Sequence, residues 1–381
     1  MTTPAPTVKT GLEDVVATSS AICYLDGARG VLAYCGYNIH ELADHATFEE
    51  VCHLLWHRRL PTRAELGELQ TQLAAARCLG EPMLRLIKGL PPGNAMDAVR
   101  TLASALSQYD PEVGDTSPEA RYRQAVRLTA QLASVVAAYG RVAAGLHPVD
   151  PDPTLSHAAN FLLMLDGERP SAVAARAFDI ALILHADHEL NASTFAARVA
   201  AATLSDLHSA VVAGIGTLKG PLHGGANAEV MAMLMAIGED ADDHRVDDVI
   251  HDMLARKVKV PGFGHRVYRT ADPRATHFRR MSREIGERTG RTRWFEISQR
   301  IETIMREDKQ IDANVDFYSA SIYFLLGIPI DLFTPIFAVS RVSGWTAHVL
   351  EQYANNRLIR PRAEYIGPAY PQTFVPLSAR R

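Results

Sequence analysis

The chain has few cysteines and no long apolar run, and each absence removes a class of protein. The four cysteines among its 381 residues all lie in the first fifth of the chain and form no Cys-x-x-Cys pair, so neither a zinc site nor a disulfide framework is expected. No stretch is apolar for long enough to cross a bilayer, and the N-terminal segment MTTPAPTVKTGLEDVV has no apolar signal core. We therefore expect a cytoplasmic protein with buried, reduced thiols.

An excess of charge of one sign is also missing. The formal net charge is −4, and no long run of the chain carries a single sign of charge. Bulk attraction to nucleic acid or to a membrane is therefore not expected, although a local basic patch could hold a small anion.

Strand signals are scarce. The segment AICYLD, the turn GARG and the segment VLAYCGY predict one short N-terminal hairpin, and the rest reads as helices separated by short Gly/Pro breaks. Helix starts are predicted at the capping box Thr62-x-x-Glu65, at Ser171, and at the pairs Asp272-Pro273 and Thr334-Pro335. The sequence predicts an all-α protein.

The length favours one large domain and one smaller domain. Two Gly-rich loops and most of the unusual polar residues fall between Gly220 and about Ala320. We predict a large domain formed by residues 1–221 and 321–381 and a small domain of residues 222–320, with the active site in the cleft between them.

The segment HADHELN, from His185 to Asn191, follows an apolar stripe. If the helix continues, Ala177, Ala181, Leu184, His188 and Asn191 share one face, which would bury the last two. A core histidine bonded to a carbonyl is one interpretation, since buried polar groups need partners. A metal site built on His-x-x-His-Glu is another, but no further ligand set is spaced to complete it.

Two Gly-flanked histidines follow. His223 lies in KGPLHGGAN before a predicted helix, whose N-terminus would favour the neutral imidazole suited to donating a hydrogen bond to an enolate. His265 lies in VPGFGHRVYRTADPR, where Arg274 occupies the first turn of a helix and therefore opposes the helix dipole. That placement of Arg274 indicates an anionic partner, although a flexible turn and a surface arginine remain the simpler interpretations.

The last motifs are NVDFYSASIYFLL and TPIFAVSRVSGWTAH. Asp316 opens an apolar helix, where desolvation would raise its pKa and suit it to be a general base, although it could simply cap the helix. Arg341 lies on an apolar face between Phe337 and Trp345, and a charge there needs an anion. Arginines bind carboxylates with two parallel hydrogen bonds, so the motifs together suit a small dicarboxylate and proton transfer without a metal.

The motifs GPLHGGAN, PGFGHRVYR-x-x-DPR and NVDFY resemble those of the citrate synthase family, in the family's order. The resemblance runs from about Gly11 to Tyr370. It implies an all-α enzyme with a large and a small domain that condenses acetyl-CoA with oxaloacetate and then hydrolyses the citryl thioester. It also implies a homodimer without the extra N-terminal β-rich domain that makes some relatives hexameric and sensitive to NADH. No cofactor is expected, because the acyl-CoA is a substrate.

The resemblance also implies residue roles. Asp316 would remove the methyl proton, His223 would stabilise the enol or enolate, and His265 would act on the ketone oxygen. The residues expected to hold oxaloacetate are His188, Arg274, Arg341 and, across the dimer interface from the neighbouring subunit, Arg360. The residues expected to contact CoA are Val260, Gly262, Phe263, Gly264 and Arg269.

Three alternatives stay open. A 2-methylcitrate synthase, which prefers propionyl-CoA, shares the same motifs, and one methylene shifts selectivity only roughly 10–200-fold. A metal-dependent hydrolase would use His185, His188 and Glu189 and would bind zinc. A helical scaffold without activity would leave the Gly-flanked histidines unexplained.

Overall fold

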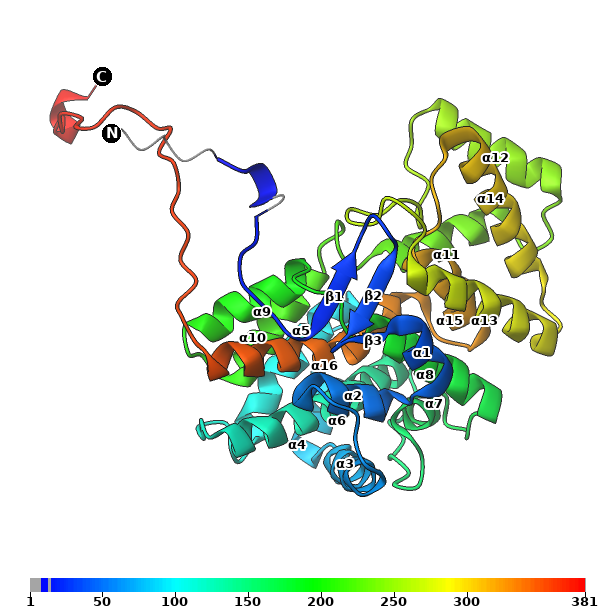
Figure 1. The fold of residues 1–381 in the computed structure, drawn as a ribbon, viewed down its shortest axis with the longest axis horizontal. Helices are drawn as coiled ribbons and strands as arrows, with labels where there is room; N and C mark the ends of the chain where they lie inside the picture. The colour runs from blue at the N-terminus through cyan, green and yellow to red at the C-terminus, as the bar shows by residue number, and fades with distance from the viewer. Residues whose placement is uncertain (1–7, 13–14, 381) are drawn as a thin grey trace.

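The computed structural model describes residues 8–12 and 15–380, which form three short strands and sixteen α-helices (Figure 1). The strands are β1 (Cys23–Asp26), β2 (Val31–Tyr34) and β3 (Tyr37–Asn38). The helices are α1 (Ile39–His45), α2 (Phe48–His57), α3 (Arg63–Ala76), α4 (Glu81–Gly89), α5 (Ala95–Leu106), α6 (Pro118–Ala143), α7 (His157–Asp166), α8 (Ala172–His185), α9 (Ala192–Ala202), α10 (Leu207–Leu218), α11 (Ala226–Ile237), α12 (Asp243–Ala255), α13 (Pro273–Thr289), α14 (Arg293–Lys309), α15 (Val315–Leu325) and α16 (Phe333–Ala354). The predicted all-α class is confirmed.

The predicted hairpin is confirmed and carries one more strand than expected. β1 pairs antiparallel with β2, with Cys23 opposite Tyr34, and the two-residue strand β3 pairs with the end of β2. Leu32, Ala33 and Tyr34 of β2 are all buried, whereas Tyr24 of β1 is exposed. β2 is therefore the strand of the hairpin that packs against the protein interior, and β1 is more exposed.

Most of the predicted helix starts are confirmed by their side-chain caps. Thr62 and Glu65 form a reciprocal capping box at α3, and the Ser171 hydroxyl accepts a hydrogen bond from a backbone N–H at the start of α8. Asp272 caps α13 in the same way, with Pro273 at the first helical position.

The start predicted at Thr334-Pro335 is wrong by a few residues. A 3₁₀ turn (Ile330–Leu332) runs directly into α16, which begins at Phe333, so Thr334 lies inside the first turn. Its hydroxyl donates to the Gly224 carbonyl at 3.0 Å, which is a tertiary contact that a local capping signal does not reveal.

The helix does not continue through HADHELN, so the condition for placing His188 and Asn191 on the face of Ala177 is not met. α8 ends at His185, and Glu189 takes a left-handed conformation (φ +53°) before Asn191 caps α9. The Asn191 side chain accepts from the Thr194 N–H at 3.1 Å, and this cap is available only if a new helix starts there. His188 is buried, as expected, but it lies in the turn between two helices.

α16 is the central helix of the fold. It packs against α6, α9, α10, α2 and α8, and nearly all of its residues from Phe333 to Val349 are buried. In Figure 1, helices α11 to α15 lie together to one side of this assembly, and α8 contacts α13 at their boundary. The division into residues 1–221 with 321–381 and residues 222–320 stays a prediction.

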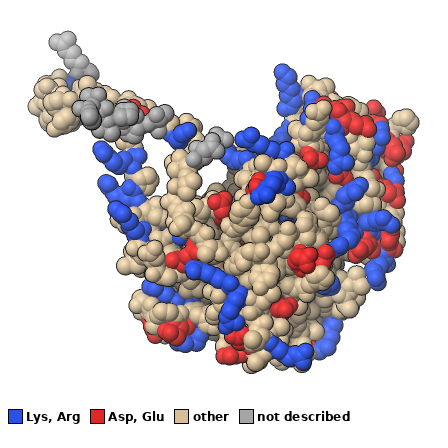
Figure 2. Space-filling view, in the orientation of Figure 1, with Lys and Arg blue, Asp and Glu red and all other residues tan. Residues whose placement is uncertain are grey.

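The charge distribution on the surface and the exposure of the four cysteines bear on the remaining expectations from the sequence. On the face shown in Figure 2, positive and negative side chains are interspersed, without a large area of one sign. All four cysteines are free, but only Cys52 is fully buried and Cys78 is exposed, so the expectation that all the thiols are buried is wrong. Among the described residues, no helix is long and apolar enough to cross a membrane.

Candidate active site

Three of the predicted segments meet around His188. Its Nε2 lies 3.1 Å from the Tyr268 hydroxyl, and its ring packs edge-on against the ring of His265, with centroids 5.2 Å apart. Burial holds the pKa of His188 well below its usual value, and the neighbouring charges of Arg274 and Arg341 lower it further. His188 is therefore a neutral imidazole. It lies close to Arg274 and Arg341, which are predicted to bind oxaloacetate with it, and to His265, which is predicted to act on the ketone oxygen.

His265 is held in one tautomer by its own loop. The backbone N–H groups of Val267 and Tyr268 both point at its Nδ1, at 3.0 and 3.2 Å. Because a backbone N–H can only donate, Nδ1 accepts, and the proton of the neutral ring is on Nε2. Burial, helped by Arg274, lowers the pKa of His265 to about 4, so the ring is neutral near pH 7 and its Nε2–H can donate to a ligand.

His223 has the opposite arrangement. Its Nε2 accepts from the backbone N–H of Ser193 at 3.2 Å and lies 2.8 Å from the Ser193 hydroxyl, so the proton is on Nδ1. Burial lowers the pKa of His223 to about 4, with a contribution from Arg341. The two Gly-flanked histidines are thus both neutral donors, one through Nδ1 and the other through Nε2.

Asp316 has the character of a base. Asn314 caps α15 by accepting from the Asp316 backbone N–H at 3.0 Å, so the cap proposed for the Asp316 side chain is made by another residue. The Asp316 carboxyl is partly buried, and desolvation raises its pKa to about 6 even though Arg274 opposes the shift. A carboxylate that is ionised at neutral pH but poorly solvated is a stronger proton acceptor than one in water.

The two buried arginines differ in their partners. Arg274 is bound by Asp272, the cap of its own helix, through its Nε at 3.0 Å and one Nη at 2.8 Å. Burial disfavours its charge, but Asp272 outweighs that and raises the pKa of Arg274. The anion expected from the helix-dipole argument is therefore supplied, at least in part, by the protein itself.

Arg341 keeps more of its guanidinium free. Within the described part of the chain its hydrogen bond is from Nε to the His185 carbonyl, at 2.6 Å, and its face lies over the Phe337 ring. Burial lowers the pKa of Arg341 to about 10, although the nearby Asp187 carboxylate favours the charge. A buried and still protonated guanidinium with free Nη groups suits a carboxylate ligand.

The Gly-rich loop 260–264 is joined to the segment that leads into Asp316. The Gly264 N–H donates to the Asp312 carbonyl at 3.1 Å, and the Asn314 N–H donates to the Gly262 carbonyl at 2.9 Å. Gly262 has φ +79°, and a Cβ there would lie 2.8 Å from atoms of Phe317 and Val230. The backbone of this loop can therefore not move far without moving the start of α15.

The structure brings some predicted residues together and leaves others apart. Val260, Gly262 and Phe263 are buried and Gly264 is half-buried, whereas the side chain of Arg269 is exposed. Arg360 is exposed on the C-terminal segment, which runs away from the body of the chain (Figure 1). Its predicted position in a neighbouring subunit's site stays a prediction.

Sequence reasoning missed four supporting side chains. Ser193 fixes the tautomer of His223, Tyr268 contacts His188, and Asp272 binds Arg274. Asp187 is fully buried and lies 3.2 Å from Nε2 of His348. Asp272 was recognised only as a cap, and Asp187 and Tyr268 lie within the quoted motifs without a role assigned to them, whereas Ser193 lies outside every quoted motif.

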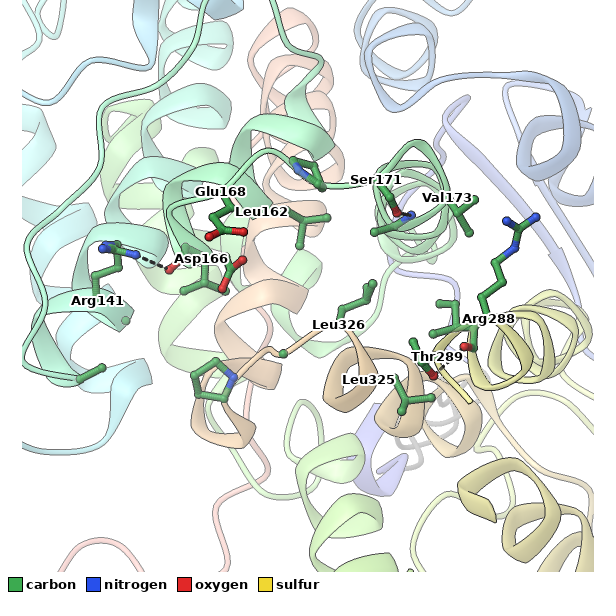
Figure 3. Close-up of a pocket in the computed structure, with 18 of the residues that line it drawn as sticks. Arg141, Leu162, Asp166, Glu168, Ser171, Val173, Arg288, Thr289, Leu325 and Leu326 are labelled. Carbon is green, nitrogen blue, oxygen red and sulfur yellow. Dashed lines mark hydrogen bonds between the residues drawn. The ribbon is translucent and has the colours of Figure 1, made fainter. Parts of the chain in front are cut away.

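A cavity of about 570 Å³ lies elsewhere (Figure 3). Leu162 and Leu326 lie toward its middle, Asp166 and Glu168 lie at one end, and Leu325 and Arg288 lie toward the other. None of the predicted site residues lines it, so this cavity is separate from the candidate active site. Among the described residues, no group of three or more His, Cys, Asp or Glu side chains could hold a metal ion.

Comparison with known proteins gives one consistent family. The family model described as citrate synthase, C-terminal domain, matches residues 11–362. The chain is 51% identical over 376 residues to citrate synthase 2 of Bacillus subtilis, covering 98% of this chain and 100% of that protein. It is 52% identical over 368 residues to the citrate synthase of Haloferax volcanii, covering 94% and 96%. Proteins named 2-methylcitrate synthase, from Shewanella oneidensis and Mycobacterium tuberculosis, match at 40% and 42% identity.

Solved structures agree with the sequence comparisons. The structure of citrate synthase from Thermoplasma acidophilum, in a ternary complex with carboxymethyl coenzyme A and oxaloacetate, superimposes with a TM-score of 0.92 at 31% identity. That match covers 99% of this chain and 100% of the other. The match to the family model over most of the sequence and the relatives at about half identity lead to one conclusion: the chain belongs to the citrate synthase family.

Proposed function

We propose that this enzyme condenses acetyl-CoA with oxaloacetate and water to give citrate and CoA. The observation that carries the proposal is the combination of one desolvated carboxylate, Asp316, with two neutral histidines that present N–H donors. A thioester methyl proton is a very weak acid, so its removal needs a base and a stabilised oxyanion in the same site. Family membership supports the same reaction.

The protonation state of each residue decides its role: the ionised carboxylate of Asp316 is the base, and the neutral His223 and His265 are hydrogen-bond donors. The Asp316 carboxylate takes the methyl proton, and the electron pair moves onto the thioester oxygen, where Nδ1–H of His223 stabilises the enol or enolate. The enol carbon then attacks the ketone carbon of oxaloacetate, and Nε2–H of His265 donates a hydrogen bond to the oxygen that becomes negatively charged. That oxygen ends as the citryl hydroxyl with the proton that Asp316 had taken, so Asp316 is again a carboxylate and His265 is again neutral. Water finally cleaves the citryl thioester and releases citrate and CoA. General acid–base steps of this kind contribute on the order of 10²–10⁴-fold each.

Substrate binding follows from the buried cations. The free Nη groups of Arg341 suit one carboxylate of oxaloacetate, Arg274 in its fixed pair with Asp272 lies near the other, and His188 lies close to both arginines. For the acyl-CoA, the backbone of Val260 to Gly264 would contact the adenine and Arg269 a phosphate. The exposure of Arg269 suits contact with a phosphate at the mouth of a site.

We infer that the working unit is a homodimer in the cytoplasm, where the four free thiols stay reduced. The C-terminal segment exposes a series of large apolar side chains, which favours docking on a second copy. They are Tyr365, Ile366, Tyr370, Phe374 and Leu377. Docking of this segment would carry Arg360 to the site of the neighbouring subunit.

Mixing two inactive variants tests the shared site. If Arg360 acts across the interface, subunit exchange between Asp316→Ala and Arg360→Ala chains gives mixed dimers in which one of two sites is intact. Because half of the randomly formed dimers are mixed, about a quarter of the parent activity should return. No recovery, in mixtures shown by mass spectrometry to have exchanged, would contradict the contribution of Arg360 across the interface.

Thiol release tests the reaction itself. The purified protein is mixed with oxaloacetate and either acetyl-CoA or propionyl-CoA, and Asp316→Ala is the control. Release that needs both oxaloacetate and Asp316 supports the proposal, and the ratio of the two kcat/KM values separates citrate from 2-methylcitrate synthesis. A folded dimer that releases no thiol from either thioester would overturn the proposal.

A further inference from the structure

The small N-terminal hairpin contacts two segments of the candidate site that are far apart in the sequence. In Figure 1 its β1–β2 turn reaches the loops beside helices α11 to α15, while β2 and β3 lie over the larger helical assembly. No role was assigned to this hairpin by the sequence motifs. Its contacts suggest that it does more than cover the core.

β2 holds the turn that carries His188. The hydroxyl of the fully buried Tyr34 lies 2.9 Å from the Asp187 carbonyl and 3.2 Å from the Ile183 carbonyl, and it accepts from the Asp187 N–H at 3.2 Å. Since a hydroxyl can donate once and accept as well, it can satisfy the backbone on both sides of the residue before His188. Tyr34 thus fixes the end of α8 and the start of the turn.

The turn of the hairpin holds the loop that follows His265. The Gly27 carbonyl accepts from the Arg269 N–H at 2.9 Å. A Cβ at Gly27 would lie 2.2 Å from the Val267 carbonyl oxygen, which is too close for any side chain and meets backbone that cannot rotate away. Only glycine allows this contact of backbone with backbone.

The residues touched by the turn are those that orient the two histidines. The N–H groups of Val267 and Tyr268 donate to Nδ1 of His265, and the Tyr268 hydroxyl lies 3.1 Å from Nε2 of His188. Displacing Val267 by the width of a methyl group would therefore disturb the ring that carries the donating Nε2–H.

We propose that the β1–β2 hairpin is a positioning element, in which Gly27 and Tyr34 together hold the His265 loop and the His188 turn in register with each other. Gly27 acts through the backbone of Val267 to Arg269, and Tyr34 acts through the backbone of Asp187. Neither residue touches the reacting atoms. The expected loss of kcat rests on the function proposed above, whereas the expected change in hydrogen exchange at the His265 loop does not.

The first test compares Gly27→Ala with Ala28→Ser, a change at the exposed neighbour in the same turn. Gly27→Ala should lower kcat on the order of 10²-fold, because misplacement of a catalytic group by about 1 Å costs about that much. The same variant should speed hydrogen exchange at the amides of residues 266–269 at least several-fold, with an unchanged circular dichroism spectrum. Ala28→Ser should match the parent in both measurements.

The second test uses Tyr34→Phe, which keeps the buried ring and removes only the hydroxyl, with Tyr24→Phe on the exposed face of β1 as its control. Tyr34→Phe should raise the KM for oxaloacetate more than it lowers kcat, because the His188 turn is the segment it holds. Tyr24→Phe should leave both constants unchanged.

The outcomes separate the two proposals. A parent enzyme that releases no thiol overturns the proposed function, and the exchange rates of residues 266–269 still decide the role of the hairpin. Parent-like exchange and parent-like kinetics in folded Gly27→Ala would overturn the inference. A loss of activity in Gly27→Ala that is matched by Ala28→Ser would overturn it as well, because the effect would not come from the contact with Val267.

Discussion

The carboxyl of Asp316 should destabilise the folded protein, and Asp316→Asn should therefore stabilise the enzyme while it abolishes activity. The asparagine side chain has nearly the same shape but carries no charge. Its amide cannot accept the methyl proton, so kcat should fall by about 10³-fold or more. Stability should change in the opposite direction, because the charge of Asp316 is held in a poorly solvated place.

The magnitude follows from the pKa of Asp316. That pKa is raised from 3.8 to about 6 by desolvation, and each unit corresponds to about 1.4 kcal/mol. Below pH 3.8 the carboxyl is protonated in both the folded and the unfolded chain, and it costs nothing. As the pH rises toward 6 the unfolded chain ionises first, so stability is lost until the folded carboxyl also ionises, and above that pH the cost is constant at about 3 kcal/mol.

Thermal unfolding of the ligand-free protein measures this cost. An unfolding entropy of about 2.1 cal/mol/K per residue gives about 0.8 kcal/mol/K for the whole chain, so about 3 kcal/mol corresponds to a rise in Tm of about 4 °C at pH 8. The rise should shrink to about half at pH 5, where the folded carboxyl of the parent is already mostly protonated. Asp248→Asn, at an exposed position on α12, is the matched control and should leave Tm unchanged.

Two results would refute the reasoning. An Asp316→Asn variant that unfolds at a lower temperature than the parent at pH 8 would mean that the carboxylate is stabilised by the site. A gain in Tm that is the same at pH 5 and pH 8 would mean that it does not come from ionisation of Asp316.

Three further predictions concern the same site. The kcat/KM for the acyl-CoA should fall with a slope of one as the pH drops below about 6, because Asp316 must be ionised while His223 and His265, with pKa values of about 4, remain neutral; initial rates between pH 5 and 9 check this. Ser193→Ala should lower kcat roughly fivefold to tenfold with little change in KM, because it removes the hydroxyl 2.8 Å from Nε2 of His223 and leaves the backbone N–H in place; steady-state kinetics with Thr194→Ser as the control check this. Arg341→Lys should raise the Kd for oxaloacetate by about 10–100-fold, because an ammonium cannot form two parallel hydrogen bonds to a carboxylate; calorimetric titration with oxaloacetate checks this.

Local sequence signals were reliable where a residue interacts with its chain neighbours. The caps at Ser171 and Asp272 and the capping box at Thr62 depend on atoms a few residues away, and all three are present. The same reasoning failed at Thr334, whose hydroxyl is used by the Gly224 carbonyl 110 residues away. A side chain with two possible partners cannot be assigned from local spacing alone.

The HADHELN segment shows the same limit. Apolar spacing identified His188 as buried, but the argument assumed a helix through Asn191 that does not form, and Asn191 is only half-buried. The buried contacts of Tyr34 with the backbone at Ile183 and Asp187 come from a strand about 150 residues earlier. They compensate the backbone groups that the interrupted helix leaves free.

The sequence by itself determined the helical class and the family, and it predicted the candidate reactive residues, because amphipathic spacing, caps and the three motifs are local properties of the chain. Only the tertiary structure decided the chemical state of those residues. The ring proton of His223 is on Nδ1 because the Ser193 N–H donates to Nε2. The ring proton of His265 is on Nε2 because the N–H groups of its own loop donate to Nδ1. Asp316 is a stronger base than a carboxylate in water because the packed protein excludes solvent from it. Tautomers and pKa values depend on neighbours brought together by folding, and those neighbours have no fixed spacing in the sequence.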